Sequence, residues 1–119
     1  MLKRTDEERA QSAMYALIRS ALRRVWLRYP ERSKCLLGAR RAYKGVNKRQ
    51  LWEFNCAECG KWCKATDVCV DHIVPCGTFL KVEHWATFGP NLFCDASKLQ
   101  VLCKEPCHKA KTAEERRKK

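Results

Sequence analysis

The segments that decide the fold are Cys56-Ala57-Glu58-Cys59, Val70-Asp71-His72-Ile73-Val74-Pro75 and Leu102-Cys103-Lys104-Glu105-Pro106-Cys107-His108. Two closely spaced cysteine pairs enclose an aspartate–histidine pair, and a second histidine follows the last cysteine directly. Thiolates at this spacing favour a structural zinc ion, whereas carboxylate and imidazole groups suit a catalytic metal with an open coordination position. The pattern therefore predicts two metal sites of different chemistry in one small domain.

Four of the nine cysteines form the predicted zinc-binding set: Cys56, Cys59, Cys103 and Cys107. The chain starts with charged residues and contains no long apolar run, so we expect a soluble, cytoplasmic protein without a membrane segment. Disulfides are rare in a reducing cytosol, where clustered cysteines more often bind metal. We expect the five other cysteines to be small buried hydrophobic groups. Cys63 is an alternative zinc ligand because it lies close to Cys59 in sequence.

Positive charge is concentrated in the first part of this 119-residue chain, whose net charge is +12. Residues 1–50 contain 14 Lys and Arg against 4 Asp and Glu, whereas residues 51–119 contain 11 against 9. This asymmetry predicts contact with a polyanion, usually nucleic acid in the cytosol. A solvated basic surface that aids solubility is the alternative. The expected DNA contacts in this part are Arg23, Arg24, Arg40 and Arg41.

Two helices are expected in the basic part. Thr5-Asp6-Glu7-Glu8 has the form of a capping box, and apolar residues recur at helical spacing over residues 10–25, before Pro30 ends the helix. We interpret this apolar stripe as core, with a dimer seam as the alternative. A second helix is predicted over residues 31–44, where Gly45 stops it.

A change of period predicts strands and turns in the second part. Residues 52–56 alternate between apolar and polar side chains as a strand does, and Gly60 permits the tight turn of a cysteine knuckle. Residues 68–70 lead as another strand into Asp71 and His72. Adjacent strand residues face opposite ways, so the backbone is expected to turn irregular there if both side chains serve one site.

The remaining segments complete an α+β arrangement. Residues 76–98 are expected to hold a loop and the returning strand. Pro106 is well placed to open a final helix over residues 107–117. Successive helical side chains diverge by about 100°, so Cys107 and His108 can serve two separate sites.

The combined motifs resemble the zinc-containing branch of the HNH endonucleases, the ββα-metal nucleases common in tailed bacteriophages. In that family Cys-x-x-Cys precedes Asp-His-Ile-x-Pro, and the ending reads roughly Asn-Leu-Gln-x-Leu-Cys-x-x-Cys-His-x-x-Lys-Thr. The match covers about residues 51–119. The resemblance implies a small ββα-metal (HNH) nuclease fold with a structural zinc knuckle over residues 51–119, preceded by a basic α-helical DNA-contacting segment over residues 1–50.

The resemblance also implies residue roles. Asp71 and His108 would hold one divalent cation (Mg²⁺, Mn²⁺ or Ni²⁺) against the scissile phosphate, and His72 would be the general base that activates water. A neutral imidazole can accept a proton near pH 7, which suits that role. Lys98 and Lys111, which lie in the same motif region, are further expected DNA contacts.

The chain departs from the family pattern at two positions. Cys103-x-x-x-Cys107 is one residue longer than the usual pair, so we expect Glu105 or Pro106 to bulge out. Lys98 stands where the family usually has Asn, whose hydrogen bonds to the backbone fix the loop geometry. Lysine at this position affects the anchoring of the loop more than proton transfer or metal binding, and Asn91 is an alternative anchor.

Two functions are consistent with these residues. The first is a metal-dependent HNH endonuclease, phage-encoded, that hydrolyses DNA phosphodiester bonds. The second is a zinc-stapled DNA-binding or packaging-accessory module with weak or no catalysis, whose partners would be DNA and phage packaging proteins. Both explain the charge and the cysteines, but only the enzyme requires Asp71, His72 and His108 together.

Overall fold

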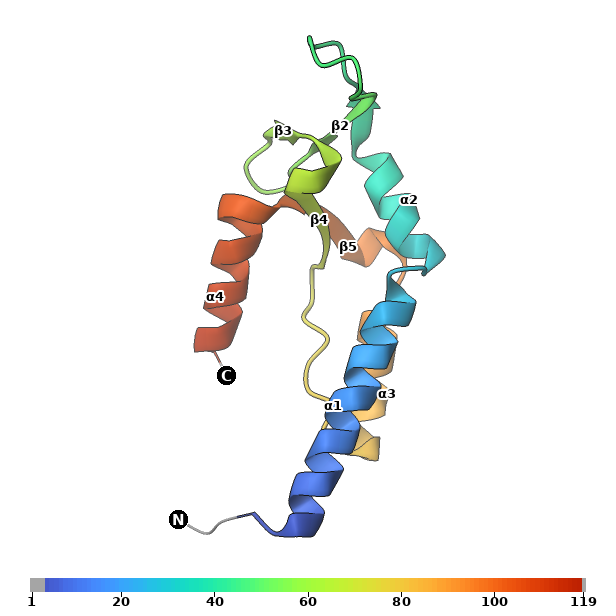
Figure 1. Ribbon diagram of the computed structural model, residues 1–119, viewed down its shortest axis with the longest axis vertical. Coiled ribbons are helices and arrows are strands. Elements are labelled where there is room, and N and C mark those ends of the chain that lie inside the picture. Colours follow the sequence, from blue (N-terminus) through green and yellow to red (C-terminus); the bar gives the residue numbers. More distant parts are fainter. Residues whose placement is uncertain (1–3, 119) are drawn as a thin grey trace.

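The computed structural model describes residues 4–118, and its architecture is mixed α+β, as predicted (Figure 1). The helices are α1 (Asp6–Trp26), α2 (Pro30–Gly38), α3 (Trp85–Leu92) and α4 (Lys109–Arg117). The strands are β1 (Arg40–Ala42), β2 (Trp52–Asn55), β3 (Trp62–Cys63), β4 (Val68–His72) and β5 (Leu99–Cys103). Residues 1–3 and 119, the ends of the two predicted segments, lie outside the described residues. No helix within residues 4–118 combines the length and apolar character needed to cross a bilayer.

Helix α1 begins at the predicted cap, where the Thr5 hydroxyl accepts a hydrogen bond of 3.1 Å from the amide of Glu8. Its buried side chains are Tyr15 and Trp26. The prediction that the aliphatic stripe is core was wrong for most of its members, because Leu17 is 72% exposed and Val25 is 59% exposed, although Leu22 packs against the core. The larger aromatic side chains bury more apolar surface, and they turn a neighbouring face of the helix towards the protein.

The second predicted helix is shorter than expected. Helix α2 ends at Gly38, and the predicted helical residues that follow form strand β1 instead. This strand pairs antiparallel with β2, which places Arg40 opposite Phe54 and Ala42 opposite Trp52. Pairing with a distant strand therefore outweighs local helix propensity, which is only a weak preference.

The strands form two small antiparallel sheets, one with the order β1-β2-β3 and the other made of β4 and β5. The β4–β5 ladder is regular to its end, with Asp71 opposite Gln100 and His72 opposite Leu99. The predicted irregular backbone at Asp71 and His72 is thus absent, and the two side chains leave opposite faces of the sheet.

The segment between β4 and β5 contains a helix that the sequence pattern did not predict. The returning strand, expected within residues 76–98, is β5, and residues 76–98 hold a loop and helix α3 instead. Phe88 and Leu92 of α3 are fully buried and belong to the core, where the Phe88 ring packs edge-on against that of Phe79 (centroids 5.2 Å apart). A helix of eight residues with Pro90 inside it gives little periodic signal, which is why loop composition hid it.

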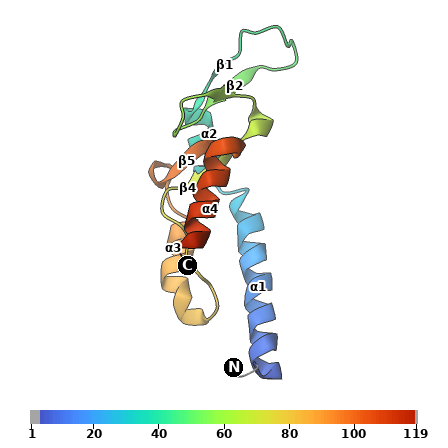
Figure 2. The same cartoon turned by 90° about the vertical axis from the view of Figure 1, so that its left-hand side faces the viewer.

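One buried cluster joins side chains from both predicted segments, including Trp26, Phe54, Val70, Phe88 and Leu102. The predicted boundary after residue 50 falls in the loop between β1 and β2. The protein is elongated, with principal extents of 59 × 28 × 24 Å. Figures 1 and 2 show helix α1 towards one end, the β1–β2 hairpin at the other, and the β4, β5 and α4 elements between them.

Candidate functional site

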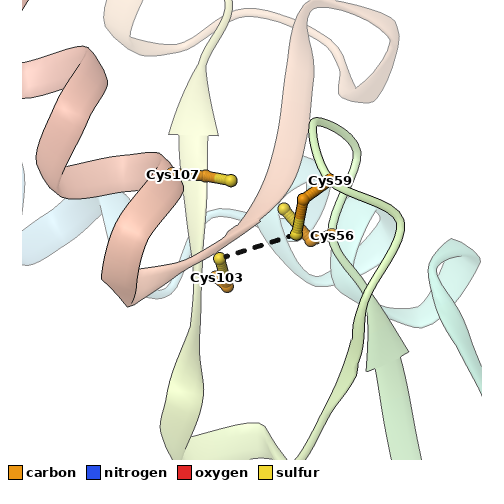
Figure 3. Close-up of side chains that lie close together, drawn as sticks. All are labelled: Cys56, Cys59, Cys103 and Cys107. Atoms are coloured by element: carbon orange, nitrogen blue, oxygen red, sulfur yellow. Dashed lines mark hydrogen bonds between the residues drawn. The ribbon is translucent and has the colours of Figure 1, made fainter.

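The four predicted zinc ligands come together (Figure 3). The sulfur atoms of Cys56, Cys59, Cys103 and Cys107 all lie within 4.8 Å of one another, and Cys59 Sγ is 4.0 Å from Cys103 Sγ. Tetrahedral zinc with bonds near 2.3 Å separates its sulfur ligands by about 3.8 Å. All four cysteines are free thiols rather than disulfides. This group could hold a structural metal such as zinc.

Three backbone elements build the cysteine group. The knuckle after β2 supplies the first pair and turns at Gly60, whose φ of 76° is a conformation that other residues rarely adopt. The end of β5 supplies Cys103. The extra residue before Cys107 is accommodated as predicted. Glu105 adopts an extended conformation (φ −133°, ψ 130°) and so interrupts the helical turn over Lys104–His108. The alternative ligand Cys63 lies outside the group.

The protonation of these thiols is strongly interdependent. Burial opposes ionisation of Cys56, but hydrogen bonds from the backbone amides of Cys59, Cys103 and Glu58 outweigh it and lower its pKa to about 6. Burial, followed by the neighbouring thiols, raises the pKa of Cys107 to about 12. Four thiolates cannot share this volume unless a cation balances their charge, as a metal ion would.

Asp71 of β4 is held from two sides. Its Oδ2 atom accepts a hydrogen bond of 3.0 Å from Gln100 Nε2 on β5 and lies 2.8 Å from Lys111 Nζ on α4. Its Oδ1 atom lies 3.7 Å from Nε2 of His108. One carboxylate oxygen is thus oriented by the protein, while the other faces an imidazole nitrogen.

His72 lies on the opposite face of β4 and packs against two elements. Its Nε2 atom is 2.9 Å from the carbonyl oxygen of Leu92, and its ring centroid is 4.7 Å from that of Trp26. A carbonyl only accepts hydrogen bonds, so Nε2 carries the proton and Nδ1 keeps a free lone pair. Burial, aided by Arg23 and Lys111, lowers the pKa of His72 below its usual 6.5, against the opposing effects of the Leu92 carbonyl and Asp71.

Although Asp71 and His72 leave opposite faces of β4, both line one cavity of about 550 Å³ at the end of this strand, together with His108. Arg23 of α1 and Arg116 of α4 add positive charge to its wall, and Glu115 adds a carboxylate. The structure therefore brings the three predicted catalytic residues together at one cavity. It also joins them to Arg23, one of the six predicted DNA contacts.

Of the other five predicted DNA contacts, four lie away from the cavity wall and Lys111 is engaged by the site itself. Arg24 and Lys98 are exposed outside the cavity wall, and Arg40 and Arg41 are on β1. Lys111 is turned inwards, with its Nζ atom 2.8 Å from carboxylate oxygens of both Asp71 and Glu115 and 2.8 Å from the backbone oxygen of His72.

The backbone anchors the loop around Lys98. Its amide donates to the oxygen of Asp95 (3.0 Å), and its own oxygen accepts from the amide of Ile73 (3.1 Å). Hydrogen bonds from the Ser97 hydroxyl and amide lower the pKa of the Asp95 carboxyl. Within residues 4–118 no hydrogen bond of the Asn91 side chain is found, so Asp95 rather than Asn91 stabilises this turn.

Several residues of the site were not assigned from sequence: Gln100, Glu115, Trp26 and the carbonyl of Leu92. Two of them had a detectable signal. Glu115 lies four residues after Lys111, the spacing of neighbours on a helix, and Gln100 is opposite Asp71 once the hairpin register is known. Leu92 had none, because its helix was not predicted.

No family model matches the chain, and neither a curated protein nor a solved structure matches it.

Proposed function

We propose that the protein is a metal-dependent endonuclease of the HNH type that hydrolyses DNA phosphodiester bonds. The observation that carries this proposal is the cavity shared by Asp71, His72 and His108 beside a four-cysteine group. Asp71 and His72 lie on β4, and His108 is in the turn directly before α4. The antiparallel strands β4 and β5 followed by helix α4 are the arrangement expected of a ββα-metal unit.

His72 is the proposed general base. Its Nδ1 atom would accept the proton of the attacking water, while the hydrogen bond from Nε2 to Leu92 keeps the ring in the required tautomer. Its lowered pKa keeps the imidazole neutral and able to accept a proton at pH 7. Positioned general bases typically contribute about 10²- to 10⁴-fold in rate.

Asp71 and His108 are the proposed ligands of a divalent cation (Mg²⁺, Mn²⁺ or Ni²⁺). Their facing atoms, a carboxylate oxygen and an imidazole nitrogen, are donors that suit such ions and leave positions open for substrate. When bound, the cation would offset negative charge that develops on the phosphate and the leaving oxygen. Arg23, on the cavity wall, would bind a neighbouring phosphate.

Zinc is the proposed occupant of the cysteine group. It would tie the knuckle after β2 to the end of β5 and the start of α4. Because His108 follows Cys107 directly, the same ion would fix His108 relative to Asp71 on β4. Apparent binding energies of structural zinc in small modules reach about 10–16 kcal/mol, enough to stabilise a domain of this size.

Plasmid cleavage with Mg²⁺, Mn²⁺ or Ni²⁺ tests this function. We expect the wild type to cleave and His72→Ala to lose at least about 10² in rate while it keeps its DNA affinity. His84→Ala is the matched control, because His84 lies outside the cavity and its Nδ1 accepts a hydrogen bond from the amide of Leu80. Equal cleavage rates for His72→Ala and the wild type would refute the nuclease proposal.

A DNA-binding or packaging-accessory module is the second candidate, and the position of Lys111 favours it. The Lys111 ammonium already balances one oxygen of Asp71, which weakens the attraction of that carboxylate for a second cation. This module would bind DNA and phage packaging proteins without cutting DNA. Either function would be carried out in the cytoplasm of a host cell. A wild type that binds DNA but cleaves none with any of the three ions would support the module.

A further inference from the structure

The β1–β2 hairpin is separate from the cavity and carries a surface of its own. Its strands are joined by residues 43–51, and Figures 1 and 2 show this loop extending beyond the rest of the chain. Hydrogen bonds within the loop hold its backbone in place. The amide of Tyr43 donates to the oxygen of Leu51 (2.9 Å), and the Asn47 side chain accepts from the amide of Arg49 (3.2 Å). At the tip, Val46 is 97% exposed.

Charge on this hairpin is mostly positive, and Glu53 of β2 is its one carboxylate. From residue 40 to residue 52 it contains five cations and no carboxylate, and the cations are Arg40, Arg41, Lys44, Lys48 and Arg49. All five are exposed. Among the ion pairs within residues 4–118, the hairpin cations contribute one, between Arg41 and Glu53. The other four are exposed and have no carboxylate partner among the described residues, which suits a polyanion.

Tryptophan rings hold the two arginines of β1 in place. The guanidinium of Arg40 lies 3.9 Å from the ring centre of Trp52, and that of Arg41 lies 3.7 Å from the ring centre of Trp62. Adjacent strand residues point to opposite faces, so each face of the ribbon carries one guanidinium. Positioned in this way, the arginines lose less side-chain entropy on binding than free ones would.

We propose that the β1–β2 hairpin enters the major groove of duplex DNA and contacts phosphates on both sides of it. The inference rests on the proposed DNA substrate and adds a contact distant from the cavity. A two-stranded ribbon fits the major groove, whereas the minor groove is about half as wide. Duplex is favoured over single strands because the rings of Trp52 and Trp62, which could stack on bases, are already covered by arginines.

Equilibrium binding to a 30-base-pair duplex, without divalent cations, tests the proposal. We compare the full chain with Lys44→Gln/Lys48→Gln/Arg49→Gln and with a charge-matched control, Arg9→Gln/Lys34→Gln/Lys81→Gln, whose cations lie outside the hairpin. Each phosphate contact contributes about −0.9 to the slope of log K against log salt, so the hairpin variant should flatten the slope by up to about 2.7. Its affinity should fall about tenfold or more near 0.1 M salt, and that of the control much less.

Dimethyl sulfate footprinting on the same duplex shows which groove the protein covers, because the reagent methylates guanine N7 in the major groove and adenine N3 in the minor groove. Protection of N7 by the wild type, lost in the hairpin variant, is expected. Protection confined to N3 would overturn the groove assignment.

Equal salt slopes for the hairpin variant and the control would overturn the hairpin contact while leaving the nuclease proposal standing. A wild type that binds no duplex would overturn both. Circular dichroism and zinc content establish that each variant is folded.

Discussion

The Nε2 atom of His72 lies 2.9 Å from the carbonyl oxygen of Leu92, twenty residues further along the chain. This hydrogen bond joins the end of β4 to the end of α3 and determines which ring nitrogen can accept a proton. It also places the half-buried imidazole against the ring of Trp26, where burial disfavours its charged form.

The first prediction concerns pH. Protonated His72 cannot act as a base, so the cleavage rate should fall as pH drops through the pKa of His72. That pKa is lowered, so the acid limb should lie below 6.5, and a cation bound at Asp71 would shift it further down. Initial cleavage rates measured from about pH 5 to 8 at saturating metal give the position of this acid limb. An acid limb above 6.5 would contradict the assignment.

The second prediction concerns the cation ligands. His108→Ala should suppress cleavage, and more divalent metal should restore part of the rate, because the variant weakens cation binding rather than proton transfer. Metal titrations of the cleavage rate measure the shift in the half-saturating concentration. His72→Ala is the comparison, since added metal should not rescue it. Rescue of both variants to the same degree would count against separate roles.

The third prediction concerns Lys111, which competes with a cation for Asp71. Lys111→Gln should bind Mn²⁺ about tenfold more tightly, equivalent to about 1.4 kcal/mol, and should lose about 1–2 kcal/mol of unfolding free energy with its charged hydrogen bonds. Calorimetric titration and denaturant unfolding measure the two effects. The control is Lys109→Gln, because the one ion pair of Lys109 within residues 4–118 is with the exposed Glu105 at 3.7 Å. Weaker Mn²⁺ binding by Lys111→Gln would mean that Lys111 orients Asp71 instead.

The fourth prediction concerns zinc. Protein purified without added metal should contain one zinc ion per chain by elemental analysis. Cys56→Ser and Cys103→Ser should lose it, and their unfolding free energy should fall by several kcal/mol. Cys69→Ser is the control, because Cys69 is outside the group and its thiol contacts the Leu102 oxygen at 3.7 Å. A zinc-free wild type that is fully folded would refute this assignment.

The fifth prediction concerns Lys98, which stands where the HNH endonucleases that the sequence resembles usually have Asn. Its side chain is exposed, and its backbone makes the contacts that hold the loop. Lys98→Asn should therefore change the unfolding free energy by less than about 0.5 kcal/mol. Cleavage should be unchanged or faster, because the substitution restores the residue usual in the family. Thermal unfolding and the plasmid assay check both expectations, and a marked loss of either would show that the lysine side chain contributes.

Local features of the fold were predictable where neighbouring residues decide the outcome. The Thr5 cap, the Gly60 turn and the extended residue before Cys107 each follow from a few adjacent positions. The cysteine group was predictable as well, since two close cysteine pairs have the spacing of metal ligands. The extent of the second helix was not, because β1 forms only when a partner strand is present.

The sequence by itself determined which donors the protein carries: four thiols, Asp71 and two histidines, at spacings typical of metal sites. Only the tertiary structure decided how each donor is held. The Leu92 carbonyl orients His72, Gln100 and Lys111 orient Asp71, and the buried face of α1 is aromatic rather than aliphatic. The physical reason is that donor chemistry and short-range periodicity are properties of neighbouring residues. Pairing between distant segments instead depends on which side chains bury the most surface together.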